Sequence, residues 1–139
     1  MAANTIPIFI KQGNFTPARI AAANTASDGS GALVTLVTAV TDGTRVDGVR
    51  FINSQATAVA SGAKVLRMFL TDTSGINPRL IGEVAMATAT RSTTVIGATA
   101  IYTFDQPIVM KSGQLMSVCM SVYVGVQDQT DACAFAGDY

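Results

Sequence analysis

Few side chains in this sequence are suited to catalysis. The chain has no histidine and a single glutamate, Glu83. General acid–base catalysis normally uses a histidine, or two carboxylates held at a defined separation. Most carboxylates here stand beside glycine or at the ends of expected strands, where an aspartate bonds to backbone amides two residues further on. We therefore interpret the acidic residues as turn formers: Asp28, Asp42, Asp47, Asp72, Glu83, Asp105, Asp128, Asp131 and Asp138.

Sequence motifs for nucleophilic, nucleotide or metal chemistry are also missing. The serines form no G-x-S-x-G elbow, and the glycines form neither G-x-G-x-x-G nor a phosphate-binding loop. Asp128 and Asp131, with Gln127 and Gln129, do not have the spacing of a calcium loop, so we expect a plain hairpin turn there. We expect no catalytic, cofactor-binding or metal-binding residues, and we do not expect an enzyme.

The two cysteines, Cys119 and Cys133, are too few for a zinc site, and no histidine could complete one. They fall in consecutive expected strands. If these strands belong to opposite sheets, about 10 Å apart, the Cα atoms exceed the distance that a disulfide bridges. We expect both to be reduced and partly buried, because free cysteine behaves as a small apolar residue.

Composition indicates one folded domain with little charge. The chain has 139 residues, of which 49% are hydrophobic and 13% charged, a balance opposite to that of disordered chains. Nine basic and nine acidic residues cancel, and the basic ones are scattered, so we expect neither nucleic acid nor a membrane as partner. The N-terminus lacks the features of a secretory signal, and we expect the protein to be made in a cytoplasm.

Short stretches of alternating residues, separated by glycine and aspartate turns, predict an almost purely β structure. Gly48, inside one of these stretches, predicts a β-bulge. Ala32–Thr41 is the clearest strand, and Leu115–Val126 alternates cleanly, with Val118 and Met120 on the apolar face that continues through Val122, Val124 and Val126. The expected strands are Ala32–Thr41, Arg45–Asn53, Ala63–Thr71, Arg79–Thr88, Thr99–Asp105, Pro107–Met110, Leu115–Val126 and Asp131–Gly137.

Strands of this number and spacing predict an all-β, single-domain antiparallel β-sandwich of the jelly-roll type, with about eight strands over residues 1–139. An immunoglobulin-like sandwich is the main alternative, and the absence of tryptophan argues against it. Residues 1–12 are expected to form an edge strand or an extended arm, because Pro7 cannot donate to a β-ladder. Residues 13–31 are expected to be a connecting loop.

Three stretches of the sequence together resemble a known class of virion protein. They are Ala23–Gly31 (ANTASDGSG), Asp42–Asp47 (DGTRVD) and the terminal Gly137-Asp138-Tyr139. In this order, with Arg79-Leu80-Ile81 and the Lys111–Gln114 turn between them, they resemble the capsid cement or head-decoration proteins of tailed phages. The resemblance covers essentially the whole chain.

This resemblance implies a structural jelly-roll protein that binds the outside of a phage capsid and stabilises contacts between major capsid subunits. The implied partners are the major capsid protein and further copies of this chain, as a dimer or trimer. The implied location is the outer surface of a virion assembled in the host cytoplasm. A carbohydrate-binding or host-surface-binding jelly roll is the alternative, and Tyr102, Tyr123 and Tyr139 are the aromatic residues available to it.

Six residues are candidate partner contacts. The arm residues could add as a β-strand to a sheet of a neighbouring protein, with backbone hydrogen bonds supplying the affinity. The alternative is an arm that folds back on its own domain. Arg67 alternates with apolar residues and could pair with a carboxylate across a contact; otherwise it is a solvated arginine packed on its sheet. The six candidates are Ile6, Ile8, Phe9, Ile10, Arg67 and Tyr139.

Overall fold

The chain folds as a β-sandwich, as predicted from the sequence. The structure is a computed structural model that describes residues 9–54, 60–125 and 128–139. Within these residues there are nine strands and no helix, and hence no helix long and apolar enough to cross a membrane. The strands are β1 (Gln12–Asn14), β2 (Ala18–Ile20), β3 (Val34–Thr38), β4 (Thr44–Asn53), β5 (Lys64–Leu70), β6 (Arg79–Met86), β7 (Thr99–Met110), β8 (Leu115–Met120) and β9 (Thr130–Asp138).

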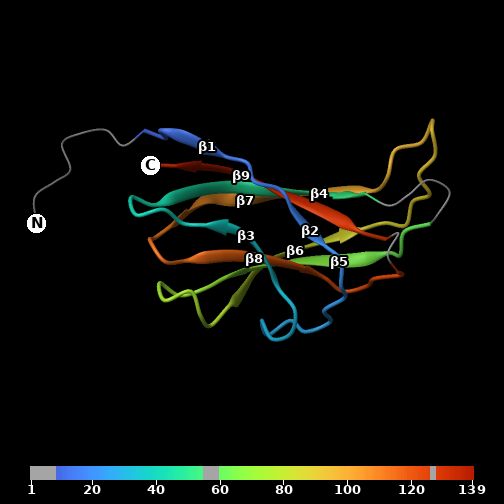
Figure 1. The fold of residues 1–139 in the computed structure, drawn as a ribbon, viewed down its shortest axis with the longest axis horizontal. Helices are drawn as coiled ribbons and strands as arrows, with labels where there is room; N and C mark the ends of the chain where they lie inside the picture. Colours follow the sequence, from blue (N-terminus) through green and yellow to red (C-terminus); the bar gives the residue numbers. More distant parts are fainter. Residues whose placement is uncertain (1–8, 55–59, 126–127) are drawn as a thin grey trace, which may run out of the picture.

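Two antiparallel sheets lie face to face (Figure 1). Sheet A has the order β1-β9-β4-β7, with β2 also paired to β9, and sheet B has the order β3-β8-β5-β6. The pairing is nested along the chain, because β2 pairs with β9, β3 with β8, β4 with β7 and β5 with β6. The pairs β9–β4 and β8–β5 then close each sheet. The middle of the chain is therefore a long hairpin that is rolled up into two layers.

The core between the sheets consists of the inward side chains of alternate residues. β4 supplies Val46, Val49 and Phe51, all fully buried, and the facing strands of sheet B contribute leucine, methionine and valine. Small residues from β9 let the two sheets approach each other. The other fully buried core residues include Leu66, Met68, Met110, Met116, Val118 and Met120.

Gly48 lies at a bulge, as predicted. The register of β4 shifts between Val46 and Gly48 against both of its neighbours, β7 and β9. A Cβ atom at position 48 would lie 2.5 Å from the backbone oxygen of Tyr102 on β7. Glycine is therefore required here by the close approach of the neighbouring strand.

The predicted connecting loop at residues 13–31 was wrong in part, because it contains two short strands. β1 pairs with the end of β9, and β2 pairs with its beginning. Each strand has only three residues, so neither could produce a readable alternation. These two segments adopt the β conformation because their backbones pair with β9.

Two other predicted strands are shorter than expected. β8 ends at Met120, because the hydroxyl of Ser121 accepts a hydrogen bond from the amide of Val65 (2.8 Å). The valines that follow leave the sheet, and Val122 and Val124 are exposed. Val126 lies outside the described residues.

β3 is the second of these strands, and it spans only Val34–Thr38 of the predicted strand Ala32–Thr41. It is an edge strand whose register shifts between Thr35 and Val37. The shift buries both Leu36 and Val37, while Thr35 and Thr38 face solvent.

The cysteines are free, as expected. Cys119 lies on β8 in sheet B and Cys133 on β9 in sheet A. Burial raises the pKa of the Cys119 thiol above its ordinary value. Cys119 is buried and Cys133 is partly buried.

Candidate interaction surface

The outer face of sheet A carries apolar side chains that lie across glycines. Gly13 on β1 stands directly opposite Gly137 on β9, so both present bare backbone to the same side of the sheet. The ring of Phe15 occupies the space that a Cβ of Gly13 would need. The side chain of Ile10 does the same at Gly137, where a Cβ would lie 2.5 Å from the Ile10 Cγ2 atom. These two side chains thus lie flat on the sheet.

The apolar surface continues across the sheet toward β7. Phe135, two residues before Gly137, lies on the same side and contacts the bare backbone at Gly48, which is its partner on β4. On β7, Ile101 stands opposite Arg50 and Val109 opposite Arg45. Phe15, Ile101 and Val109 expose 61%, 55% and 58% of their area. We call this surface, formed by Ile10, Phe15, Ile101, Val109 and Phe135, the apolar face of sheet A.

Most charges on this side of the sheet are paired. Arg19 on β2 and Asp131 on β9 form an ion pair of 2.8 Å, whose hydrogen bond lowers the pKa of Asp131 and raises that of Arg19. Arg45 binds Asp47 at 2.8 Å. Arg50 makes no ion pair with any described residue. The surface therefore has little net charge beside its apolar side chains.

The C-terminal residues of the chain fix one corner of this surface. The carboxylate of Asp138 accepts hydrogen bonds from the hydroxyl of Thr44 (2.6 Å) and from the side-chain amide of Asn14 (3.3 Å). The amide of Tyr139 donates to the carbonyl of Gly43 (3.1 Å). Two of the stretches that carry the resemblance to decoration proteins, Asp42–Asp47 and Gly137–Tyr139, are therefore in contact.

Three of the six predicted contact residues, Phe9, Ile10 and Tyr139, belong to the two chain segments that are joined at this corner. The amide of Lys11 donates to the carbonyl of Asp138, and its ammonium lies 3.5 Å from the Asp42 carboxylate. The chain just before Lys11 is thereby held beside β9, with Ile10 across Gly137 and Phe9 74% exposed. Tyr139 is half-buried beside them. Ile6 and Ile8 lie outside the described residues.

Arg67 does not belong to this surface. It lies on β5 in sheet B, and its guanidinium binds the carboxylate of Glu83 on the adjacent strand β6 at 2.7 Å. It also donates to the carbonyl of Thr25 (3.4 Å). Within the chain, cross-strand pairing thus supplies Glu83 as the carboxylate partner of Arg67, and a pairing across a subunit contact stays a prediction.

The three tyrosines do not form a joint platform for a sugar. Tyr102 packs between the sheets, edge-on to Phe104 with ring centroids 5.2 Å apart, and lies against Gly82 of β6. Tyr123 packs against the core. Tyr139 alone lies at the corner described above.

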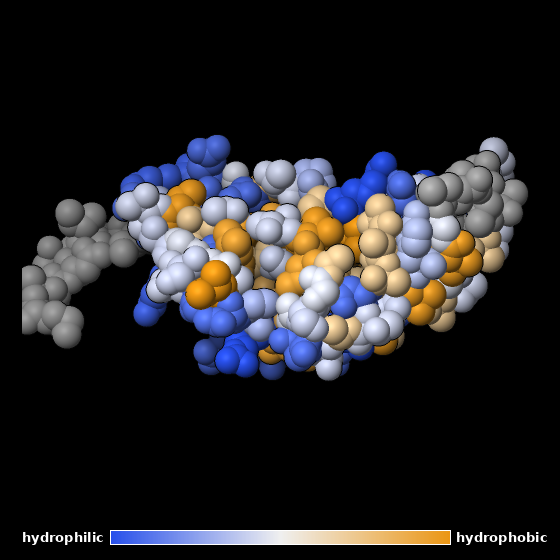
Figure 2. Space-filling model, turned by 60° about the horizontal axis from the view of Figure 1, so that its bottom comes forward, coloured by the Kyte–Doolittle hydropathy of each residue, from blue (hydrophilic) through white to orange (hydrophobic). Residues whose placement is uncertain are grey.

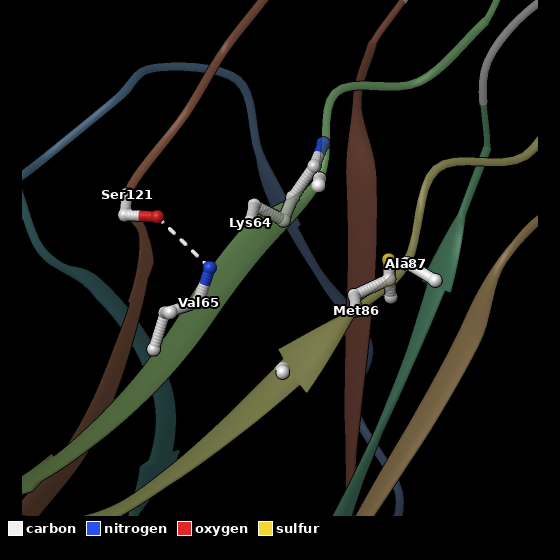
Figure 3. Close-up of a pocket in the computed structure, with 7 residues that line it drawn as sticks. Lys64, Val65, Met86, Ala87 and Ser121 are labelled. Carbon is white, nitrogen blue, oxygen red and sulfur yellow. Dashed lines mark hydrogen bonds between the residues drawn. The ribbon is translucent and has the colours of Figure 1, made fainter.

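The surface depressions are open and not enclosed. One, of about 500 Å³, lies between β5 and β6 and is lined by Lys64, Ser121 and small or apolar residues (Figure 3). The Ser121 hydroxyl is occupied by its bond to the Val65 amide. On the side of the molecule that carries sheet B, hydrophobic atoms lie in separate groups among polar ones (Figure 2).

Several acidic residues form turns, as interpreted from the sequence. The Asp28 carboxylate binds the amide and hydroxyl of Ser30, which lowers the pKa of Asp28. The Asp72 carboxylate binds the side chain of Asn77 and the amides of Ile76 and Ser74, and these bonds lower its pKa. Within the described residues, no three histidine, cysteine or acidic side chains gather as a metal site.

Other acids depart from the turn interpretation, because Glu83 lies in β6 and Asp131 in β9, where each pairs with an arginine. Asp128 departs from it in another way, which sequence reasoning missed. Its side chain is buried and binds the ammonium of Lys64 at 2.6 Å. A plain hairpin turn was expected, because nothing in the sequence around Asp128 indicates burial. An isolated lysine at the start of an expected strand, Lys64, was the available signal, since buried lysines and acids occur almost only in pairs.

The fold and this surface define a β-sandwich with an apolar outer face on one sheet. No family model matches the chain, and no curated protein is significantly similar to it.

Proposed function

We propose that this protein is a structural virion protein of the cement or decoration type, which binds the outer surface of a phage capsid. The observation that carries the proposal is the apolar face of sheet A, where Ile10, Phe15 and Phe135 pack across glycines and Ile101 and Val109 are exposed. Apolar patches of this kind on a soluble surface mark sites of protein association. The resemblance to decoration proteins supplies the capsid as the partner.

The strand order supports the finer fold expected for such a protein. A hairpin with nested pairs, rolled into two sheets that each contain four of its strands, is the arrangement of a jelly roll. We therefore infer a jelly-roll topology, in which β2 to β9 form the eight strands and β1 extends the ladder on β9.

We infer that binding uses two elements. The apolar face of sheet A packs on the capsid, and residues 1–10 add to the edge of a neighbouring capsid sheet by backbone pairing. Lys11 and β1 remain attached to β9 and fix the point from which this segment leaves. Each contact is modest, and repetition around a closed shell, together with pairing of copies as a dimer or trimer, raises the overall strength.

The test mixes the purified protein with capsids that lack it and measures the bound fraction by co-sedimentation. We expect saturable binding and a higher temperature of capsid disruption. Phe15→Ser should reduce the bound fraction at least tenfold, because a large exposed ring at the centre of a contact contributes about 2 kcal/mol or more. Failure of the wild-type protein to co-sediment at any concentration would contradict the proposal.

The matched control is Ile96→Ser. Ile96 is 83% exposed and lies in the segment between β6 and β7, at the opposite end of the molecule from β1 (Figure 1). This variant should bind capsids as the wild type does. If both variants lose binding equally, general surface hydrophobicity, and not the apolar face of sheet A, is responsible.

A further inference from the structure

A buried polar cluster lies at the end of the sandwich where the chain leaves sheet A and enters sheet B. Asn53 is the last residue of β4, and Lys64 is the first residue of β5. Between them stands Asp128, which precedes β9. The side chains of Lys64 and Asp128 expose 0% and 1% of their area, and Asn53 is equally buried.

One oxygen atom joins the three side chains. Asp128 Oδ1 accepts a hydrogen bond from Lys64 Nζ (2.6 Å) and another from Asn53 Nδ2 (2.8 Å). The other oxygen, Oδ2, accepts hydrogen bonds from the backbone amides of Val124 (3.1 Å) and Gly62 (3.4 Å). The carboxylate is therefore fixed from four directions, and the amine and the carboxamide are neighbours around it.

These three groups are the components of an amide-forming reaction. A primary amine is a nucleophile when it is neutral, and a carboxamide carbon is an electrophile. A carboxylate that touches both groups is placed to carry protons between them. Burial of the site excludes water, and transfer of one proton from Lys64 to Asp128 converts a buried ion pair into two neutral groups.

We propose that Lys64 and Asn53 form an intramolecular isopeptide bond, with Asp128 as the proton carrier. Asp128 takes one proton from the Lys64 ammonium, and the free Nζ attacks Asn53 Cγ. The Nζ–Cγ bond forms. Asp128 then gives its proton to the departing Nδ2 and takes the second proton from Nζ, and the Cγ–Nδ2 bond breaks. Ammonia leaves, and Asp128 remains as a neutral acid beside the new amide.

The position of this bond gives it a structural use. It would join the end of β4 in sheet A to the start of β5 in sheet B, and so link the two layers. A covalent tie between the sheets resists their separation, because it limits the unfolded chain as a disulfide does. The inference does not rest on the proposed capsid function.

Peptide mapping of the purified full chain by mass spectrometry tests the proposal. Without the bond, trypsin releases residues 51–64, because it cleaves after Arg50 and Lys64. With the bond, Lys64 is blocked, and the product is residues 51–67 with a mass lower by that of ammonia, about 17 Da. Fragmentation of this peptide should give no fragment ions from single backbone cleavages between residues 53 and 64, because the cross-link holds the two parts together.

Two variants control the experiment. Lys64→Arg keeps a positive charge beside Asp128 and removes the amine nucleophile, and Asp128→Asn keeps the shape and removes the proton carrier. In both variants, trypsin should cleave after residue 64. The released peptide 51–64 should show no loss of ammonia. If either variant fails to fold, the wild-type map alone decides.

Three results would overturn the proposal. One is a wild-type peptide 51–64 of full mass after prolonged incubation. Another is loss of ammonia with normal cleavage after Lys64, which indicates a succinimide at Asn53–Ser54 instead. The last is loss of water with Lys64 joined to Asp128, which makes the aspartate the electrophile.

Discussion

Ile10 packs across the bare backbone of Gly137, its side chain occupying the space that a Cβ at position 137 would need. This contact joins the N-terminal segment to the last strand of the chain, where Lys11 also binds the carbonyl of Asp138. The N-terminal segment is thus attached at Ile10 and Lys11 to the surface that we propose contacts the capsid.

Deletion of residues 1–10 should separate binding from folding. Ile10 is 45% exposed and none of the buried core residues precedes it in the described chain, so we expect little change in the midpoint of thermal unfolding. The fraction bound to capsids should fall, because the segment for strand addition is lost. Calorimetry and co-sedimentation measure the two effects. Unchanged capsid occupancy would exclude a binding role for this segment, and deletion of residues 1–14, which also removes β1, should lower the unfolding midpoint.

Lys64→Ala should strongly destabilise the fold. It leaves the Asp128 carboxylate buried without its counter-charge, and loss of one partner of a buried pair costs about 3–5 kcal/mol. Denaturant unfolding measures the difference. The matched control is Lys11→Ala, which removes an exposed pair with Asp42 and should change stability by less than about 1 kcal/mol. Equal effects of the two substitutions would show that Lys64 is not buried.

Gly48→Ala should destabilise the protein by about 1–3 kcal/mol, because the new Cβ overlaps the backbone oxygen of Tyr102 and the strands must shift. Thr103→Ala, on the residue opposite Gly48, is the control, and it should be nearly neutral since Thr103 is exposed. Urea unfolding of both variants is the measurement. A neutral Gly48→Ala would contradict the close approach at the bulge.

Stability should fall in acid and be flat near neutrality. Hydrogen bonds from Asn77, Ser30 and Arg19 lower the pKa values of Asp72, Asp28 and Asp131, respectively. A carboxyl with a lower pKa in the folded state stabilises the fold above its unfolded pKa, about 3.9, and this contribution is lost as pH falls through the folded pKa.

The unfolding midpoint should therefore hold down to about pH 5 and drop below about pH 4. Asp72→Asn should lower the midpoint at neutral pH and make the acid drop smaller, because position 72 no longer titrates. Calorimetry between about pH 2 and 7 measures both. An equal or steeper acid drop in the variant would assign the effect to other groups.

The main strands were predictable because their alternation is long and their turns are marked. The predicted strand over residues 45–53 agrees with β4, and the Asp42-Gly43 turn and the Gly48 bulge were also predictable from local residues. β1 and β2 were not, because three residues carry no pattern and their pairing with β9 is a tertiary effect. The end of β8 depends on the Ser121 hydroxyl, a contact that alternation does not indicate.

The candidate surface was predictable only where it is local. Phe9 and Ile10 lie in an apolar segment, and Tyr139 lies in a terminal motif, so the local sequence alone indicated them as contact residues. That Phe15 and Phe135 join them depends on the pairing of Gly13 with Gly137, between residues far apart in the sequence. The cluster of Asn53, Lys64 and Asp128 was missed for the same reason, since it joins three separate segments.

The most direct test of the central claim is an electron cryomicroscopy map of capsids incubated with this protein. We predict density for the β-sandwich on the outside of the shell, with the apolar face of sheet A turned toward the capsid and Phe15 at the contact. Capsids without added density, or a bound sandwich whose sheet A faces solvent, would contradict the account.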